Sequence, residues 1–171
     1  MESLRLEPRF DAARISARVK EIAGLLDAEF PRQVPALVSV LKGSSFLLAD
    51  LAREMKVRVA CEYIAVSRHA SDQILQIDFA TGFPLGRSVI LLKDVVHTGA
   101  LESYLISQLA AAGASPIRLV SILDKVAERT TDISVDHALF STEGGRFVGY
   151  GMDQDGQYAN LPYIAEVCAS Y

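Results

Sequence analysis

The sequence predicts an α/β fold, in which a Rossmann-like central parallel sheet is flanked by helices. Apolar runs typical of strands buried on both faces alternate along the chain with segments whose apolar residues recur at helical spacing. Polar loops that contain glycine or serine follow the apolar runs, at the edge where parallel sheets bind their ligands. The chain has 171 residues and no internal repeat or linker, so we expect a single domain over 1–171.

The first half of the chain opens with a predicted helix at 11–30. Its apolar side chains recur at helical spacing, and the prolines at 31 and 35 end it. The run ALVSVL at 36–41 predicts a strand buried on both faces. The elements expected next are a helix, a β-branched strand and a short hairpin strand, at 46–55, 57–66 and 74–79.

The second half continues the alternation of strands and helices. The run SVILLKDVV at 88–96 predicts the third main strand, and a helix is expected at 99–112, with Gly113 suited to a left-handed cap. The run IRLVSIL at 117–123 predicts the fourth strand. The remaining elements are short strands expected near 135–140 and 147–150.

Composition and charge exclude several classes of protein. The net charge of −4, from 17 basic and 21 acidic residues, does not indicate a nucleic-acid coat or a membrane-surface patch. We see no signal peptide at the start, and no apolar run approaches the ~20 residues that span a bilayer. Cys61 and Cys168 fit neither a zinc spacing nor a CxxC pair, and the apolar run around Cys61 predicts an inert core thiol. We therefore expect a cytoplasmic protein with no nucleic-acid or membrane partner.

The unusual chemistry lies in four loops that follow strands, at 42–45, 67–73, 97–101 and 124–129. Thr98-Gly99-Ala100 joins small residues to the start of a helix, which favours a phosphate site, although a plain turn fits equally well. Taken singly, Lys42 fits a solvated strand end, and Asp124-Lys125 fits a strand-end salt bridge. Together at one edge of a sheet, they favour a site for an anionic ligand.

Five stretches of the sequence resemble the hypoxanthine–guanine phosphoribosyltransferases, and the resemblance covers nearly the whole chain. They are LKGSSFLLADL, EYIAVS, VILLKDVVHTGALESYL, ILDKVAERT and FVGYGMDQDGQYANLPYI, of which the last is the most specific. The resemblance implies one phosphoribosyltransferase domain with the type I fold and a small hood. It also implies a purine-salvage transferase that makes a nucleoside monophosphate and pyrophosphate from phosphoribosyl pyrophosphate and hypoxanthine or guanine. Magnesium and a homo-oligomer, a dimer or tetramer, are implied as well.

Several residues match the family's phosphate and metal positions. Lys42 and Gly43 match its pyrophosphate loop, in which the family has a cis peptide bond before the lysine. Asp153 matches a carboxylate that helps to hold magnesium, as the preference of this ion for oxygen ligands requires. Asp94 matches an acid that faces the ribose hydroxyls and the metal. The cradle for the 5′-phosphate matches Thr98, Gly99, Ala100 and Leu101.

Three further residues match the family's purine site. Lys125 matches the lysine that donates to the 6-oxo group of the purine. Phe147 matches the ring that stacks on the base, and Val148 matches the residue whose backbone faces the edge of the base. Judged by its own position alone, Phe147 fits a core aromatic on a late strand better, and only the motif around it favours the stacking role.

The loop that holds phosphoribosyl pyrophosphate diverges from the family pattern. Lys93 replaces an acid, which changes the local charge by +2. Its ammonium can occupy the place of the metal ion or repel that ion. His97 replaces the aspartate that handles the purine N7 proton; a neutral imidazole can still accept a proton near pH 7. Leu101 replaces a threonine that donates to the phosphate, and Ala159 replaces an arginine that reaches the pyrophosphate. The mobile loop, at 67–73 here, is shorter than in the family.

These replacements leave more than one function open. In the first hypothesis the chain is an active hypoxanthine–guanine phosphoribosyltransferase, with His97 and Asp94 as catalytic residues. In the second it is a catalytically impaired homologue that binds purine nucleotide as a regulator or as a partner subunit. A third, weaker hypothesis is a different base or leaving group on the same scaffold.

Overall fold

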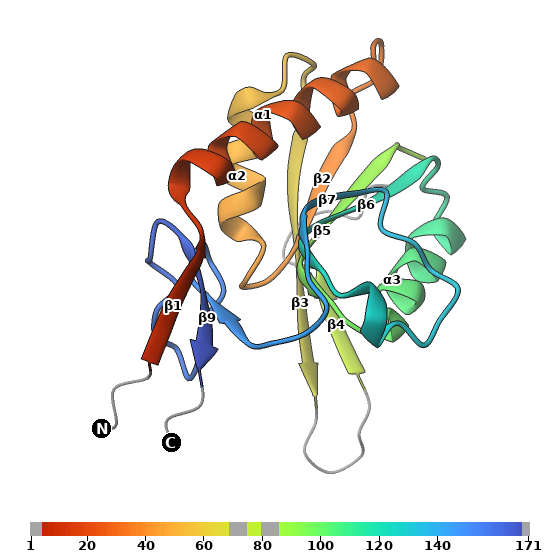
Figure 1. Cartoon of the computed structure of the whole chain (residues 1–171). Helices are drawn as coiled ribbons and strands as arrows, with labels where there is room; N and C mark the ends of the chain where they lie inside the picture. The colour runs from red at the N-terminus through yellow and green to blue at the C-terminus, as the bar shows by residue number, and fades with distance from the viewer. Residues whose placement is uncertain (1–4, 69–74, 80–85, 169–171) are drawn as a thin grey trace.

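The computed structural model describes residues 5–68, 75–79 and 86–168, and its main feature is a six-stranded sheet in the order β4-β3-β2-β5-β6-β7. Neighbouring strands are parallel from β3 to β7, and β4 pairs antiparallel with β3. In Figure 1 the parallel strands point downward, so their carboxyl ends share the lower edge. The strands are β2 (Ala36–Val40), β3 (Ala60–Arg68), β4 (Leu75–Phe79), β5 (Val89–Val96), β6 (Ile117–Asp124) and β7 (His137–Ser141).

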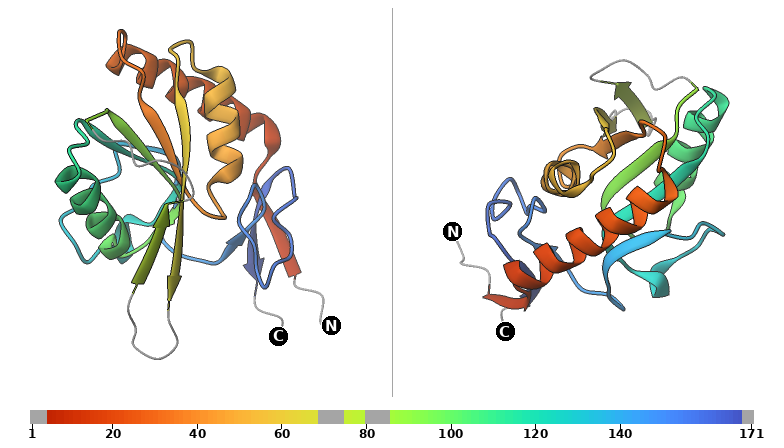
Figure 2. Two further views of the ribbon diagram at one scale, coloured as in Figure 1. Left: turned by 180° about the vertical axis from the view of Figure 1, so that it is seen from behind. Right: turned by 90° about the horizontal axis from the view of Figure 1, so that it is seen from above.

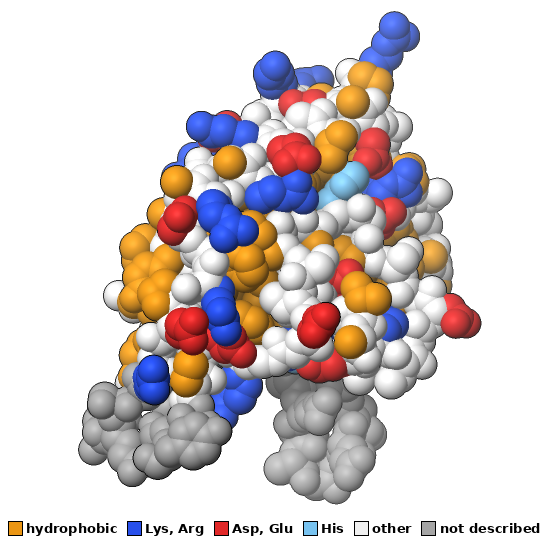
Figure 3. Space-filling view, viewed as in Figure 1, with side chains coloured by type: hydrophobic (Ala, Val, Ile, Leu, Met, Phe, Trp, Pro, Cys, Tyr) orange, Lys and Arg blue, Asp and Glu red, His pale blue; other side chains and the backbone are white. Residues whose placement is uncertain are grey.

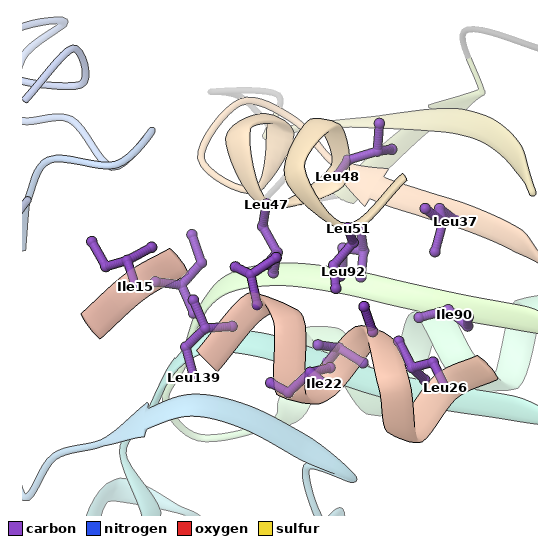
Figure 4. Close-up of a cluster of buried hydrophobic side chains, with 14 of the residues drawn as sticks. Ile15, Ile22, Leu26, Leu37, Leu47, Leu48, Leu51, Ile90, Leu92 and Leu139 are labelled. Atoms are coloured by element: carbon purple, nitrogen blue, oxygen red, sulfur yellow. The ribbon is translucent and has the colours of Figure 1, made fainter. Parts of the chain in front are cut away.

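Helices cover both faces of this sheet, with α1 (Ala12–Glu29) and α2 (Ser45–Glu54) on one face and α3 (Ala100–Ala111) on the other (Figure 2). Side chains alternate along a strand, so Leu37 of β2 packs toward α1 and α2, while Val38 packs toward α3. Figure 4 shows leucine and isoleucine side chains of α1 and α2 directed at Leu37, Ile90 and Leu92 of the sheet. Burial on both faces explains why these strands are apolar without a break.

A second sheet stands beside the carboxyl end of the first (Figure 1). It has three antiparallel strands in the order β1-β9-β8: β1 (Arg5–Phe10), β9 (Ile164–Cys168) and β8 (Phe147–Val148). We call this sheet and the segment 149–163 the hood. The hood therefore joins the two ends of the described chain and brings a late segment over the sheet edge.

The predicted fold class is confirmed, and so are the positions of the main helices and parallel strands. The expected strand at 147–150 ends at Val148, because Gly149, Tyr150 and Gly151 all take positive φ angles of 97°, 51° and 93°. β1 and β9 were not predicted from the residue pattern. β1 contains a proline and is largely exposed, as edge strands often are.

Cys61 is exposed, so the expectation of a buried core thiol was wrong. β4 pairs with β3 only from Ile64 onward, which leaves the start of β3 at the edge of the sheet.

Acidic and basic side chains intermingle over the face shown in Figure 3, without a field of one sign. Within the described residues, no helix is long and apolar enough to cross a bilayer.

Candidate active site

A pocket of about 190 Å³ lies between the carboxyl edge of the sheet and the hood. The sheet contributes the loops that follow β5 and β6, and the hood contributes β8 and the turn after it. The lining residues are Val95, His97, Lys125, Gly145, Arg146, Phe147, Asp153 and Gln154. The structure thus brings together four residues that the sequence had singled out: His97, Lys125, Phe147 and Asp153.

Lys125 is held at the base of this pocket by its backbone. Its N–H donates to the carbonyl of Val96 at 3.0 Å, which joins the loop after β6 to the end of β5. The residue is only 5% exposed, and its Nζ lies 3.3 Å from Oε1 of Glu128. A buried ammonium with donors to spare suits a carbonyl acceptor on a flat ligand.

His97 reaches the same carboxylate from the other side. Its Nδ1 lies 3.0 Å from Oε2 of Glu128, so the two Glu128 oxygens divide between an imidazole and an ammonium. The hydrogen bonds with His97 and Lys125 lower the pKa of Glu128. Glu128 thereby stays ionised and carries a negative charge at the rim of the pocket.

The turn at residues 98–101 is anchored against the segment 130–133. The carbonyl of Thr98 accepts from the N–H of Thr130 at 3.1 Å and from the hydroxyl of Thr131 at 3.0 Å. Gly99 has a φ of 82°, and a side chain there would collide with Thr131 and Ile133. The side chain of Leu101 is apolar and packs against the cluster beneath α3, so it adds no hydrogen-bond donor to the turn. The backbone N–H groups at the start of α3 remain the donors for an anion.

The loop after β2 is pressed between two other segments. The Leu41–Lys42 peptide bond is cis, and a side chain at Gly43 would collide with the carboxylate of Asp94. On the hood side, a Cβ at Gly151 would come within 2.5 Å of the Gly43 carbonyl oxygen. The loop that carries Lys42 and Gly43 therefore lies between Asp94 of the sheet and Gly151 of the hood.

Lys93 and Asp94 form an ion pair with each other beside this loop. Oδ1 of Asp94 also accepts from the N–H of Val95 at 2.8 Å. Lys93 points to the α3 face of the sheet, where burial lowers its pKa and the nearby Glu102, only 4% exposed, opposes that shift. The end of β5 thus holds a largely buried cation with two acids around it.

The residues present fit a magnesium ion only in part. The Asp153 carboxylate lines the pocket and is exposed, and one of its oxygens, Oδ2, accepts from the N–H of Gly156 at 2.7 Å. Asp94 already contacts an ammonium, which disfavours a second cation. Among the described residues, no group of three or more His, Cys, Asp or Glu side chains could hold a metal ion on its own. A magnesium here would need oxygens from its ligand as well as from Asp153.

The sequence interpretation did not single out Glu128. An acid three residues after Lys125 was the available signal, since a turn of 3₁₀ helix, η1 (Val126–Glu128), brings these positions together. The salt bridges considered for the end of β6 do form, because Asp124 pairs with Arg129 and Lys125 with Glu128. The side chain of Arg68 and residues 69–73 lie outside the described residues.

The remaining predicted residues take different places. Val148 is buried where β8 pairs with β9, and the carbonyl of Ala159 accepts from the N–H of Gly151 at 2.9 Å.

A larger groove of about 610 Å³ lies between α1, α2 and the hood. Among the described residues, none of the four strand-end loops lines this groove, although Phe46 in the first turn of α2 does. The smaller pocket, where two of those loops meet the hood, is therefore the better candidate for chemistry.

Comparison with known proteins supports this assignment. The phosphoribosyl transferase domain family matches residues 10–155. The hypoxanthine-guanine phosphoribosyltransferase of Bacillus subtilis is 30% identical over 156 residues, which cover 88% of this chain and 86% of that protein. A crystal structure of a hypoxanthine-guanine phosphoribosyltransferase from Bacillus anthracis superimposes with a TM-score of 0.88 at 26% identity, over 97% of this chain and all of that one. The hypoxanthine phosphoribosyl transferase of Trypanosoma cruzi gives 0.89 at 26% identity, over 98% and 94% of the two chains.

Proposed function

Because the chain belongs to the hypoxanthine-guanine phosphoribosyltransferase family, we propose that it joins hypoxanthine or guanine to the phosphoribosyl group of phosphoribosyl pyrophosphate. N9 of the purine bonds to C1′ of the ribose, and the bond from C1′ to the pyrophosphate oxygen breaks with its electron pair leaving on pyrophosphate. The purine loses its N7 proton. The products are a nucleoside 5′-monophosphate and pyrophosphate.

One observation carries the proposal: Lys125, Phe147 and His97 line a single pocket, next to the turn at 98–101. In the proposed complex, the purine stacks on the Phe147 ring and its 6-oxo group accepts from Lys125. Burial of Val148 in the hood sheet sets its backbone beside the edge of the base. These contacts orient the base so that its N9 is aligned with C1′ of the ribose. Holding the two reactants in this geometry is a main contribution of the enzyme to the rate.

We assign the phosphate groups to the two loops on either side of the pocket. The 5′-phosphate lies on the backbone N–H groups of Thr98, Gly99, Ala100 and Leu101. The pyrophosphate lies against Lys42 and Gly43, with the ammonium of Lys42 as the neutralising charge. Asp94 faces the ribose hydroxyls through the carboxylate oxygen that Val95 does not engage.

His97 accepts the proton that the purine loses. Its ring lines the pocket, and a neutral imidazole has one nitrogen with a free lone pair. Magnesium, bound by Asp153 and the pyrophosphate oxygens, would neutralise the leaving group. Asp94 fits that ion less well because of its ion pair with Lys93.

The test is a transfer assay with phosphoribosyl pyrophosphate, magnesium and either hypoxanthine or guanine. The wild type should form nucleotide, and Lys125→Met should lower kcat/KM by about 10- to 100-fold, the loss of a hydrogen bond from a charged donor. Glu54→Ala, an exposed acid on α2, is the matched control and should leave the rate unchanged. A wild type that forms no nucleotide from either base would refute the proposal.

A second candidate function is nucleotide binding without turnover. The internal ion pair of Lys93 and Asp94 favours it, because the ribose hydroxyls and a metal must compete with that pair. Both functions predict that inosine or guanosine monophosphate binds, which calorimetry measures, and only the first also predicts transfer. The transfer assay therefore separates them, and a chain that binds neither nucleotide would rule out the second.

We also propose that the protein acts in the cytoplasm as a homo-oligomer, a dimer or tetramer. A study of the Trypanosoma cruzi relative concerns its oligomeric state, which supports testing the same property here. Sedimentation at several protein concentrations distinguishes these states from a monomer.

A further inference from the structure

We infer that Glu128 is a positioning residue for the reaction, because its carboxylate fixes the His97 ring and Lys125 at the same time. The inference deepens the proposed function and rests on it. In this arrangement His97 donates Nδ1–H to Glu128 and presents Nε2 as the acceptor for the purine proton. Glu128 acts through these two side chains and does not itself touch the base.

The geometry gives each partner a separate oxygen. Oε2 lies 3.0 Å from Nδ1 of His97, and Oε1 lies 3.3 Å from Nζ of Lys125. The N–H of Glu128 donates to the carbonyl of Lys125 at 3.0 Å, so the carboxylate sits on a short, closed turn. The proton acceptor and the base-binding donor are therefore tied to one group.

The chemistry selects a single tautomer of His97. A carboxylate can only accept a hydrogen bond, so Nδ1 must carry the hydrogen and Nε2 of the neutral ring must carry the lone pair. When Nε2 takes the N7 proton, the electron pair of the N7–H bond stays in the purine ring while the N9–C1′ bond forms. The ring becomes an imidazolium, and Glu128 stabilises that charge, as a carboxylate does in a catalytic triad.

Other charges near His97 do not duplicate this role. The charged side chains around the pocket are Lys125, Arg146, Asp153 and Glu128 itself. The acid closest to Lys125 in sequence, Asp124, is taken by Arg129. Asp153 shares the pocket, but the hydrogen bond that the structure shows for it is to Gly156. Among the described residues, the ion pairs found for His97 and Lys125 are both with Glu128.

The first measurement is ¹⁵N NMR of protein labelled in its three histidines, at a pH where the rings are neutral. His97→Gln identifies the His97 signals. In the wild type they should show hydrogen on Nδ1, and in Glu128→Ala they should change to the pattern with hydrogen on Nε2. Glu128→Gln keeps an acceptor oxygen and should retain most of the wild-type pattern. This readout needs no turnover.

The second measurement is a double-mutant cycle in the transfer assay. Glu128→Ala should lower kcat about tenfold or more in the wild type, and should cause no loss of kcat in the His97→Asp variant, where no ring remains to be oriented. An increase in KM for the base in both backgrounds would report the effect on Lys125. Glu54→Ala is again the matched control.

Each outcome decides the matter. If the wild type transfers and Glu128→Ala leaves kcat and the His97 tautomer unchanged, the inference fails and the proposed function stands. An equal loss of kcat in both backgrounds also overturns the inference, since Glu128 would then not act through His97. If the wild type forms no nucleotide, the proposed function fails and takes the inference with it.

Discussion

The two halves of the pocket differ in how their charges are satisfied. On the half that we propose for the purine, Lys125, Phe147 and Asp153 line the pocket between sheet and hood, and the Lys125 ammonium keeps donors beyond its ion pair with Glu128. On the half that we propose for the ribose and phosphates, which we call the ribose half, Lys93 and Asp94 already neutralise each other, and Leu101 packs into the core. In this proposal a ligand meets a spare ammonium donor and an aromatic ring on the first half, and must compete with an ion pair between neighbouring residues on the second.

The largest effect is expected from a variant that tests whether Lys93 neutralises the acids around it in the ribose half. Lys93→Glu would place a third acid beside Asp94 and Glu102, so it should lower the free energy of unfolding by about 3 kcal/mol, the low end for breaking a buried pair, because Lys93 and Asp94 are only partly buried. Urea denaturation measures the change.

A companion variant makes that result specific. Adding Glu102→Gln to Lys93→Glu should recover part of the loss, because it removes one of the three acids. If Lys93→Glu is as stable as the wild type, Lys93 does not neutralise Asp94 and Glu102. The contrast between the two halves is then lost.

A smaller effect is expected from loosening the hood, which carries the purine half. The hydroxyl of Tyr150 donates to Oδ2 of Asp50 on α2 at 2.6 Å, and Tyr150→Phe should cost about 1.5 kcal/mol, the low end for a charged acceptor. KM for the base should rise while KM for phosphoribosyl pyrophosphate stays the same. An equal rise in both would show that the hood does not serve the purine half alone.

The same contact has a pH signature. Burial, together with the hydrogen bond to Asp50, raises the pKa of Tyr150 well above its usual value of about 10. The unfolded chain then loses this proton first, so the contribution of Tyr150 to stability is complete below pH 10 and declines as the pH rises above it. The stability difference between the wild type and Tyr150→Phe should therefore shrink above pH 10.

The smallest effect comes from restoring one donor to the ribose half. Leu101→Thr returns a hydroxyl to the turn at 98–101 and should lower KM for phosphoribosyl pyrophosphate by about 2- to 10-fold, the worth of one hydrogen bond. Because Leu101 packs against the cluster under α3, the variant should also be slightly less stable. An unchanged KM, with the stability cost present, would mean that the hydroxyl does not reach the phosphate.

Much of the fold followed from the sequence because its main elements are apolar on both faces or strictly periodic. Leu37, Ile90 and Leu92 belong to runs whose burial can be read from composition alone. β1 and β9 could not be found that way, since an exposed edge strand with a proline has no distinctive pattern. Cys61 was misplaced because its run is apolar and yet begins at the sheet edge.

Site residues could be predicted where the residue type within a matching stretch is enough. They could not be predicted where a contact between side chains of different elements decides the role. Lys125 and Phe147 follow from their places in long matching stretches, and the structure puts both in one pocket. The contact of Glu102 with Lys93 and that of Glu128 with His97 depend on how α3 and η1 lie against the sheet edge. No local pattern encodes such distances across elements.

The close approach at Gly43 has a consequence for how this protein can diverge. Gly43 touches Asp94 on one side and the backbone of Gly151 on the other, so main-chain atoms set the gap between sheet and hood there. A side chain added at Gly151 would push the hood away from the loop after β2, and one added at Gly43 would displace the Asp94 carboxylate, so divergence at either position must move a neighbouring group.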